Sequence, residues 1–149
     1  MGSRWCSRLR VFRACFEQSS KVEDLEDAIS SYHESLTLYP PGHPDRSYSL
    51  MNLAKALLTR FGLSSRMEDL EDAISSNRQA LILCPPGHSN RSNLIMNLAE
   101  ALLTHFHQSG RMEDLEDVIS SYHETLTLYP PDHPNRSNSL INQSSFDSL

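Results

Sequence analysis

A chain of 149 residues with 38% hydrophobic and 7% aromatic content has little material for one deep core, so an elongated, layered fold is favoured. Its formal net charge of -6 argues against nucleic-acid and anionic-membrane surfaces, which need clustered Lys and Arg. Three cysteines without a repeating spacing do not indicate a disulfide framework, and no run approaches the roughly 20 apolar residues of a membrane span. We therefore expect a cytoplasmic protein with neither nucleic acid nor membrane as a partner.

One motif recurs three times with a constant shift of 45 residues. The string "VEDLEDAISSYHESLTLYPPGHPDRS" begins at Val22, and similar strings begin at Met67 and Met112. A fixed period of this length is typical of repeat proteins. The period divides the chain into a degenerate half-repeat (1–21), two full repeats (22–66 and 67–111) and a truncated third repeat (112–149) with a frayed or disordered end. We expect these units to form one domain.

The first 21 residues have the pattern of a degraded repeat helix. Phe16 stands 45 residues before Phe61 and therefore occupies the equivalent position. Four apolar residues recur on one helical face: Trp5, Leu9, Phe12 and Phe16. The segment also carries four arginines and no acidic residue before Glu17, a composition that faintly resembles an organelle presequence. The half-repeat is the preferred interpretation, because the 45-residue shift accounts for its apolar positions.

Each full repeat begins with an acidic amphipathic helix. In the first repeat, six apolar residues share one face: Leu25, Ala28, Ile29, Tyr32, Leu36 and Tyr39. Ser20 and Glu23, like Ser65 and Glu68, have the spacing of a capping box, so we expect helix starts there. The double proline at Pro40 ends the helix, because neither proline can donate a backbone hydrogen bond.

The loop "PPGHPDR" (Pro40–Arg46) recurs as "PPGHSNR" and "PPDHPNR". Its histidines, His43, His88 and His133, would be two helix layers apart in successive repeats, about 16–20 Å, which is too far for a shared metal ion. The loop therefore predicts a stop, a turn and a helix start. We expect Pro44 near the first helical position. We also expect the residue that follows it in the motif to cap the next helix: Asp45, Asn90 and Asn135.

A second amphipathic helix follows each loop. Its apolar face is wide enough to touch two neighbours: Leu50, Leu53, Ala54, Leu57, Leu58 and Phe61 in the first repeat, with equivalents from Ile95 to Phe106 in the second. Two such helices per unit, stacked antiparallel, predict an all-α fold, an α-solenoid of helix pairs. After Asn142 the pattern is lost. The third repeat would then leave apolar surface uncovered, so we expect its last unit to fray or to associate end to end.

These residues resemble the tetratricopeptide repeat family. "NLAKAL" (Asn52–Leu57) and "NLAEAL" (Asn97–Leu102) are similar to the first helix of that repeat, and "AISSYHESL" (Ala28–Leu36) to the second. The usual unit has about 34 residues, so about 11 extra residues fall in the two connections. The long unit is similar to kinesin-light-chain-type repeats and closer to the fungal arrays that precede a caspase-like CHAT peptidase domain. The resemblance covers Phe12 to Asn142.

One polar stripe is the candidate peptide-binding site. It consists of Tyr48, Asn52, Lys55 and Thr59 on the first copy of the second helix, and Asn93, Asn97, Glu100 and Thr104 on the next. In the family that it resembles, this face lines a concave groove whose matching asparagine binds a peptide backbone. The resemblance makes Asn52 and Asn97 the anchors, with two idle surface amides as the alternative. The stripe has too few basic residues for a carboxylate clamp.

Other residues are weaker candidates for chemistry. Cys84 and His88 could form a nucleophile and its base, but tyrosine replaces Cys84 in the other repeats, which favours a small core residue. His105 and His107 lie on different faces of a helix and are poorly placed as joint ligands. The "MEDLED" clusters lack the alternating form of a calcium loop and fit a helix start. We expect no catalytic residue, no metal and no cofactor.

The sequence therefore predicts a protein-interaction module that holds an extended peptide or a partner helix, with no catalysis of its own. A second hypothesis makes the chain a regulatory array fragment of a CHAT-type peptidase whose catalytic domain is missing. A third makes it a self-associating structural scaffold.

Overall fold

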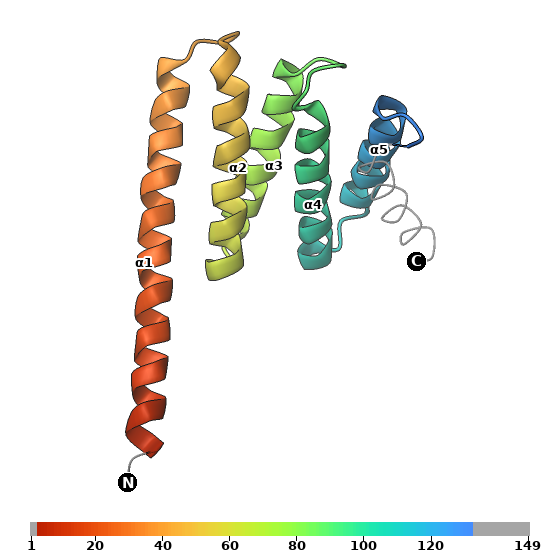
Figure 1. Cartoon of the computed structure of the whole chain (residues 1–149). Coiled ribbons are helices and arrows are strands. Elements are labelled where there is room, and N and C mark those ends of the chain that lie inside the picture. The colour runs from red at the N-terminus through yellow and green to blue at the C-terminus, as the bar shows by residue number, and fades with distance from the viewer. Residues whose placement is uncertain (1–2, 133–149) are drawn as a thin grey trace.

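The computed structural model describes the backbone of residues 3–132 and the side chains of residues 21–132. This part of the chain contains five α-helices and no strand, so the all-α prediction is confirmed (Figure 1). The helices are α1 (Ser3–Leu38), α2 (Pro44–Ser64), α3 (Met67–Leu83), α4 (Arg91–Ser109) and α5 (Met112–Leu128). No helix in this part is long and apolar enough to cross a membrane.

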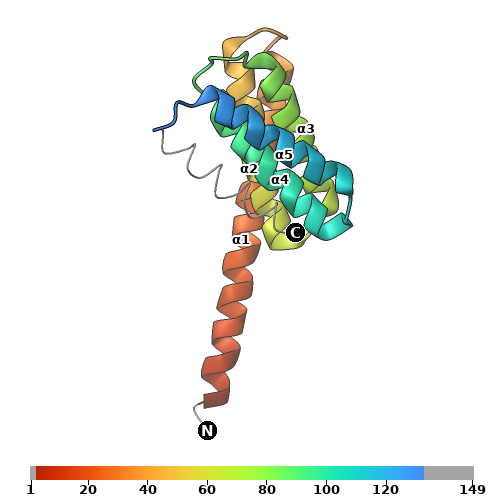
Figure 2. The same cartoon turned by 90° about the vertical axis from the view of Figure 1, so that its right-hand side faces the viewer.

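Helices that follow one another in the chain pack side by side. Within the described residues, α1 packs on α2, α2 on α3, α3 on α4 and α4 on α5, and α2 also touches α4. The helices form a row in which short connections reverse the chain direction (Figures 1 and 2). The 45-residue period reappears in the element bounds, because α3 and α5 start at Met67 and Met112, and α2 and α4 end at Ser64 and Ser109.

The predicted helix start at Ser20 is wrong. Residues 3–38 form one continuous helix, and the first half of α1 extends well past the ends of the other helices (Figure 1). The equivalent turns elsewhere contain glycine or a left-handed residue: Ser65 has a φ of 54° and Gly110 a φ of 71°. At this position the segment "FEQSSKV" has Ser20, and a serine, unlike a glycine, has no preference for the left-handed conformation, so the helix can continue through it.

The second predicted capping box is also wrong. Ser65 adopts a left-handed conformation at the C-terminal end of α2, and its backbone N–H donates to the Phe61 carbonyl oxygen. The N-terminal cap of α3 is Arg66, which makes no side-chain cap hydrogen bond. Ser65 therefore ends α2, and Arg66 starts α3 without a side-chain cap.

The core lies along the wide apolar faces of α2 and α4, as predicted. On α2, Leu53, Ala54 and Leu57 are buried in one cluster with Ile29 of α1 and Ala73 of α3. On α4, the equivalent residues are buried between α3 and α5: Leu98, Ala99 and Leu102 pack with Leu70, Ile74, Val118 and Tyr122. The alanines permit close approach of the helix axes, and the leucines fill the space between them.

The third repeat is described only in part. The α5 helix is regular to Leu128 and buries Val118, Tyr122 and Thr125. The loop residues His133 and Asn135, the loss of pattern after Asn142 and the frayed end predicted for this repeat lie outside the described residues.

Candidate functional site

The histidine of the recurring loop makes the same backbone hydrogen bond in both described loops. His43 precedes α2, and its Nδ1 accepts a hydrogen bond from the backbone N–H of Asp45 at 3.2 Å. His88 repeats the arrangement, with Nδ1 accepting from the N–H of Asn90 at 3.1 Å. The side-chain cap predicted for Asp45 is therefore corrected, because His43 is the N-cap of α2. Asn90 is the N-cap of α4, as expected, but makes no side-chain cap hydrogen bond. Pro44 is the first residue of α2, as expected.

An arginine in the same loop was missed as a structural residue. The Arg46 guanidinium donates to the carbonyl oxygens of Leu36 at 2.7 Å and Tyr39 at 2.6 Å, which are the unpaired carbonyls at the end of α1. Arg91 donates to the equivalent carbonyls of Leu81 and Cys84 at the end of α3. The signal was present in the sequence, since an arginine ends every copy of the loop motif.

Cys84 and His88 do not form a nucleophile and its base. Cys84 is fully buried in a cluster with Leu50, Met51, Ala80 and Leu94. The Nδ1 atom of His88 already accepts a hydrogen bond from the backbone N–H of Asn90. Cys84 is therefore the small core residue at a helix end that the sequence favoured.

His105 and His107 point to different surroundings, as their spacing predicts. His105 is buried, and its Nδ1 lies 2.6 Å from Asp114 Oδ2. His107 is exposed and lies beside the Phe106 ring. Among residues 21–132, no group of three His, Cys, Asp or Glu side chains is placed to hold a metal ion.

The residues of the predicted peptide-binding stripe lie on α2 and α4. Tyr48 is 58% exposed, Lys55, Thr59, Asn93 and Glu100 are exposed, and Asn52, Asn97 and Thr104 are half-buried. The two threonine hydroxyls donate to carbonyls one turn earlier, Lys55 and Glu100, and are thus engaged by their own helices. The stripe offers one aromatic side chain, three amides and two opposite charges.

Asn52 and Asn97 differ from the threonines because their side-chain amides make no hydrogen bond to the backbone of their own helix. Asn97 is half-buried, and its Nδ2 is covered and has no hydrogen-bond partner. Rotation of the amide by half a turn exchanges its donor and acceptor ends, so the end that reaches the surface can serve either role. A peptide backbone presents both a donor and an acceptor, which this side chain can match.

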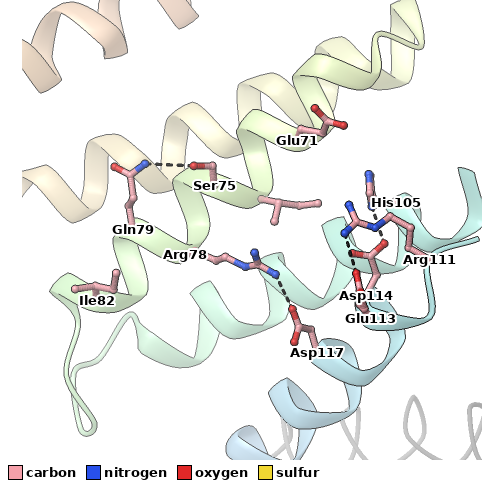
Figure 3. Close-up of a pocket in the computed structure, with 11 residues that line it drawn as sticks. Glu71, Ser75, Arg78, Gln79, Ile82, His105, Arg111, Glu113, Asp114 and Asp117 are labelled. Carbon is pink, nitrogen blue, oxygen red and sulfur yellow. Dashed lines mark hydrogen bonds and ion pairs between the residues drawn. The ribbon is translucent and has the colours of Figure 1, made fainter. Parts of the chain in front are cut away.

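Two clefts lie on a different side of the helices. The larger, of about 520 Å³, is lined by residues of α3 and α5, with His105 of α4 and Arg111 beside them (Figure 3). The smaller, of about 230 Å³, lies between α1 and α3 over α2. Ser75 and Gln79 of α3 line both. Neither of these two clefts contains a residue of the predicted stripe.

Helix geometry explains the separation. Successive residues turn by about 100° around an α-helix, so Leu50, Leu53 and Leu57 point about 140–200° away from Tyr48. These leucines line the smaller cleft. The stripe and the clefts are therefore two distinct surfaces, the first on α2 and α4 and the second centred on α3.

The larger cleft is crossed by paired charges. Arg78 Nη2 of α3 lies 2.6 Å from Asp117 Oδ2 of α5, and both side chains are about half exposed. Arg111 and Glu113 form a second pair at 2.8 Å, and Gln79 donates to the Ser75 hydroxyl at 3.3 Å (Figure 3). The hydrogen bond and the negative charge of Glu113 raise the pKa of Arg111. The Arg78–Asp117 pair therefore links α3 to α5 across the cleft.

No protein-family model matches the chain, and no curated protein is significantly similar to it.

Proposed function

We propose that the chain is a tetratricopeptide-like α-solenoid that acts as a protein-interaction module without catalysis. Supporting it are two helix pairs related by a 45-residue shift, α2 with α3 and α4 with α5, which bury equivalent faces. In the equivalent loops, the histidine accepts the same backbone hydrogen bond and the arginine donates to the same carbonyl oxygens. Units that repeat their packing in this way build extended surfaces, which suit binding better than catalysis.

The proposed binding surface is the stripe on α2 and α4. The observation that carries it is the Asn97 amide, which is half-buried beside the core and has a donor without a hydrogen-bond partner. Because the covered Nδ2 atom itself is out of a ligand's reach, a ligand would bond the other end of the amide, which rotation can present as donor or acceptor. Asn52 occupies the equivalent position one repeat earlier, so a ligand lying across both helices would meet the same group twice.

The neighbouring side chains indicate what kind of ligand fits. Tyr48 is a large exposed aromatic residue, the type that anchors peptide side chains at low entropic cost. Lys55 and Glu100 give the stripe one charge of each sign, so it has no strong preference for an acidic or a basic peptide. The proposed ligand is an extended peptide or a partner helix bound mainly through its backbone and shallow apolar contacts.

The test is selection of binders from a displayed library of random peptides, followed by calorimetry with the hits. Asn52→Ala/Asn97→Ala should weaken binding by about tenfold or more, as expected for the loss of two hydrogen bonds. Gln79→Ala is the matched control, because Gln79 is an exposed amide on α3 that lines the clefts instead. Hits that lose affinity with Gln79→Ala and keep it with the double variant would move the site to α3.

A further inference from the structure

One face of α1 is less buried than the same face of α3 and α5. In α3 the face consists of Ala73, Asn77 and Ala80, and in α5 of Val118, Tyr122 and Thr125; all six are buried. The equivalent residues of α1, Ala28, Tyr32 and Ser35, are half-buried. In contrast, Ile29 and Ile74, which belong to the neighbouring face, are buried in both α1 and α3.

The difference follows from which helices are present. The α3 helix packs against α2 before it and α4 after it, and α5 packs against α4 before it. Within the described residues, α1 packs only against α2, which follows it. The half-buried face of α1 is therefore the one that a preceding helix covers in the other repeats.

A polar contact gives the same result independently. In α3 and α5, an acidic residue near the helix start is buried against the preceding helix: Asp69 with Arg60, and Asp114 with His105. The equivalent residue of α1 is Asp24, which is exposed. Cys15 occupies the position of Arg60 and His105 in the sequence.

The helix that would cover this face is part of α1 itself. By the 45-residue shift, residues 3–19 correspond to most of α2 and α4, from Tyr48 and Asn93 to the ends of those helices, yet they continue α1 in a straight line away from the body (Figure 1). Their apolar residues, Trp5, Leu9, Phe12 and Phe16, have the spacing of a single helical face. They also carry four of the 13 Lys and Arg residues and one of the 19 Asp and Glu residues, Glu17.

We propose that residues 3–19 cover the exposed face of α1 in a second copy of the chain. The contact of Arg60 with Asp69 sets the register: the equivalent pair is Cys15 of one copy and Asp24 of the other. The two α1 helices then run antiparallel about a two-fold axis near Ser19 and Ser20, and each covers the other. This assembly is independent of the proposed peptide-binding stripe, which lies on α2 and α4.

The continuity of α1 favours a second copy over the chain's own residues. The basic segment would lie along Glu23, Asp24 and Asp27, which are exposed in α1. Folding back within one chain needs a left-handed residue at the position of Ser65 and Gly110, which in α1 is Ser20 inside a continuous helix. A straight α1 can reach only another molecule.

The first experiment measures the mass of the full chain by light scattering over a concentration series. A dimer is expected. Ala28→Glu places a charge on the proposed contact and should weaken the dimer by about tenfold or more, because the carboxylate would be buried without a partner. Ser30→Glu is the matched control, since Ser30 is exposed about 160° away around the same helix. A monomeric wild type, or equal effects of the two variants, would overturn the proposal.

The second experiment tests the register by cross-linking with a short bismaleimide in a Cys6→Ser background. Asp24→Cys should give a covalent dimer with the native Cys15 of the other copy, whereas Glu26→Cys, on the other side of α1, should not. Within one straight helix, residues 15 and 24 are about 13.5 Å apart along the axis. A cross-link inside one chain, or none, contradicts the proposal. Ser20→Gly, which favours the turn, should convert the dimer product into the single-chain product.

Discussion

His105 Nδ1 lies 2.6 Å from the carboxylate of Asp114, at the place where Arg60 holds Asp69 one repeat earlier. Both acidic residues are the third residue of their helices, and both are buried. Each contact joins the end of one helix to the start of the next, and each carboxylate lies near the positive end of a helix dipole. Arginine and histidine therefore fill the same position in successive repeats.

The first prediction is that Asp69→Asn costs more stability than Asp114→Asn. The hydrogen bond to Asp69 raises the pKa of Arg60, so Arg60 stays charged in the folded protein. Removal of its partner leaves a charge that is largely buried, at a cost of about 3–5 kcal/mol. Histidine, unlike arginine, carries no permanent charge, so Asp114→Asn removes a hydrogen-bond partner and should cost about 1–3 kcal/mol. Urea unfolding of both variants measures the difference.

The direction of the Arg60 pKa shift also determines how the contribution of this contact to stability depends on pH. Because the pKa is raised in the folded state, its contribution is fully present below the ordinary arginine pKa and is lost only as the pH rises past it. The extra cost of Asp69→Asn should therefore persist at pH 8 and 9. Equal costs for the two variants at pH 8 would show that Arg60 is not confined by Asp69.

The second prediction concerns Asn77, which is fully buried and whose amide oxygen and nitrogen both lack a hydrogen-bond partner. The other repeats have tyrosine at this position, Tyr32 and Tyr122. Asn77→Leu has a similar shape without polar atoms and should raise the free energy of unfolding by about 1–3 kcal/mol. Gln79→Leu, exposed on the same helix, should change it by less than about 0.5 kcal/mol. A loss of stability in Asn77→Leu would mean that the amide has a partner in solution.

The third prediction ranks the two loop arginines. Both bind carbonyl oxygens at the end of the preceding helix, but Arg91 Nε also lies 2.7 Å from Glu124 of α5. The equivalent of Glu124 for Arg46 is Gln79, which carries no charge. Arg91→Ala should therefore destabilise the protein by about 1 kcal/mol more than Arg46→Ala. The extra cost should disappear in a Glu124→Gln background, where an unchanged ranking would rule out the ion pair as its cause.

Much of the fold could be predicted because the spacing of apolar residues and the prolines that end helices are local signals. The second helix of each repeat, its packing on two neighbours and the end of the preceding helix before Pro40 all follow from residues within one repeat. The cap assignment at Asp45 failed because α2 starts one residue earlier, at Pro44, so that His43 is the N-cap and Asp45 lies within the first turn. Spacing alone does not decide such a small difference in the helix start.

The continuity of α1 could not be predicted from the capping box at Ser20. A capping box describes what happens if a helix starts there, and does not exclude a helix that arrives from the preceding residues. The turn position carries no consistent signal, since the left-handed residue is Ser65 in one turn and Gly110 in the other, while its counterpart in α1 is Ser20. The candidate stripe was predicted by resemblance, and its exposure and the state of the Asn97 amide needed the packed neighbours.

The most direct test of the proposed function is an NMR titration of the labelled chain with a peptide selected from the random library. The side-chain amides of Asn52 and Asn97 give their own signals beside those of the backbone. The account predicts that these signals and the backbone amides of Lys55 and Glu100 shift on binding, while those of Ser75 and Gln79 stay unchanged. Shifts confined to Ser75, Gln79 and Arg78, with both asparagine side chains unaffected, would contradict it.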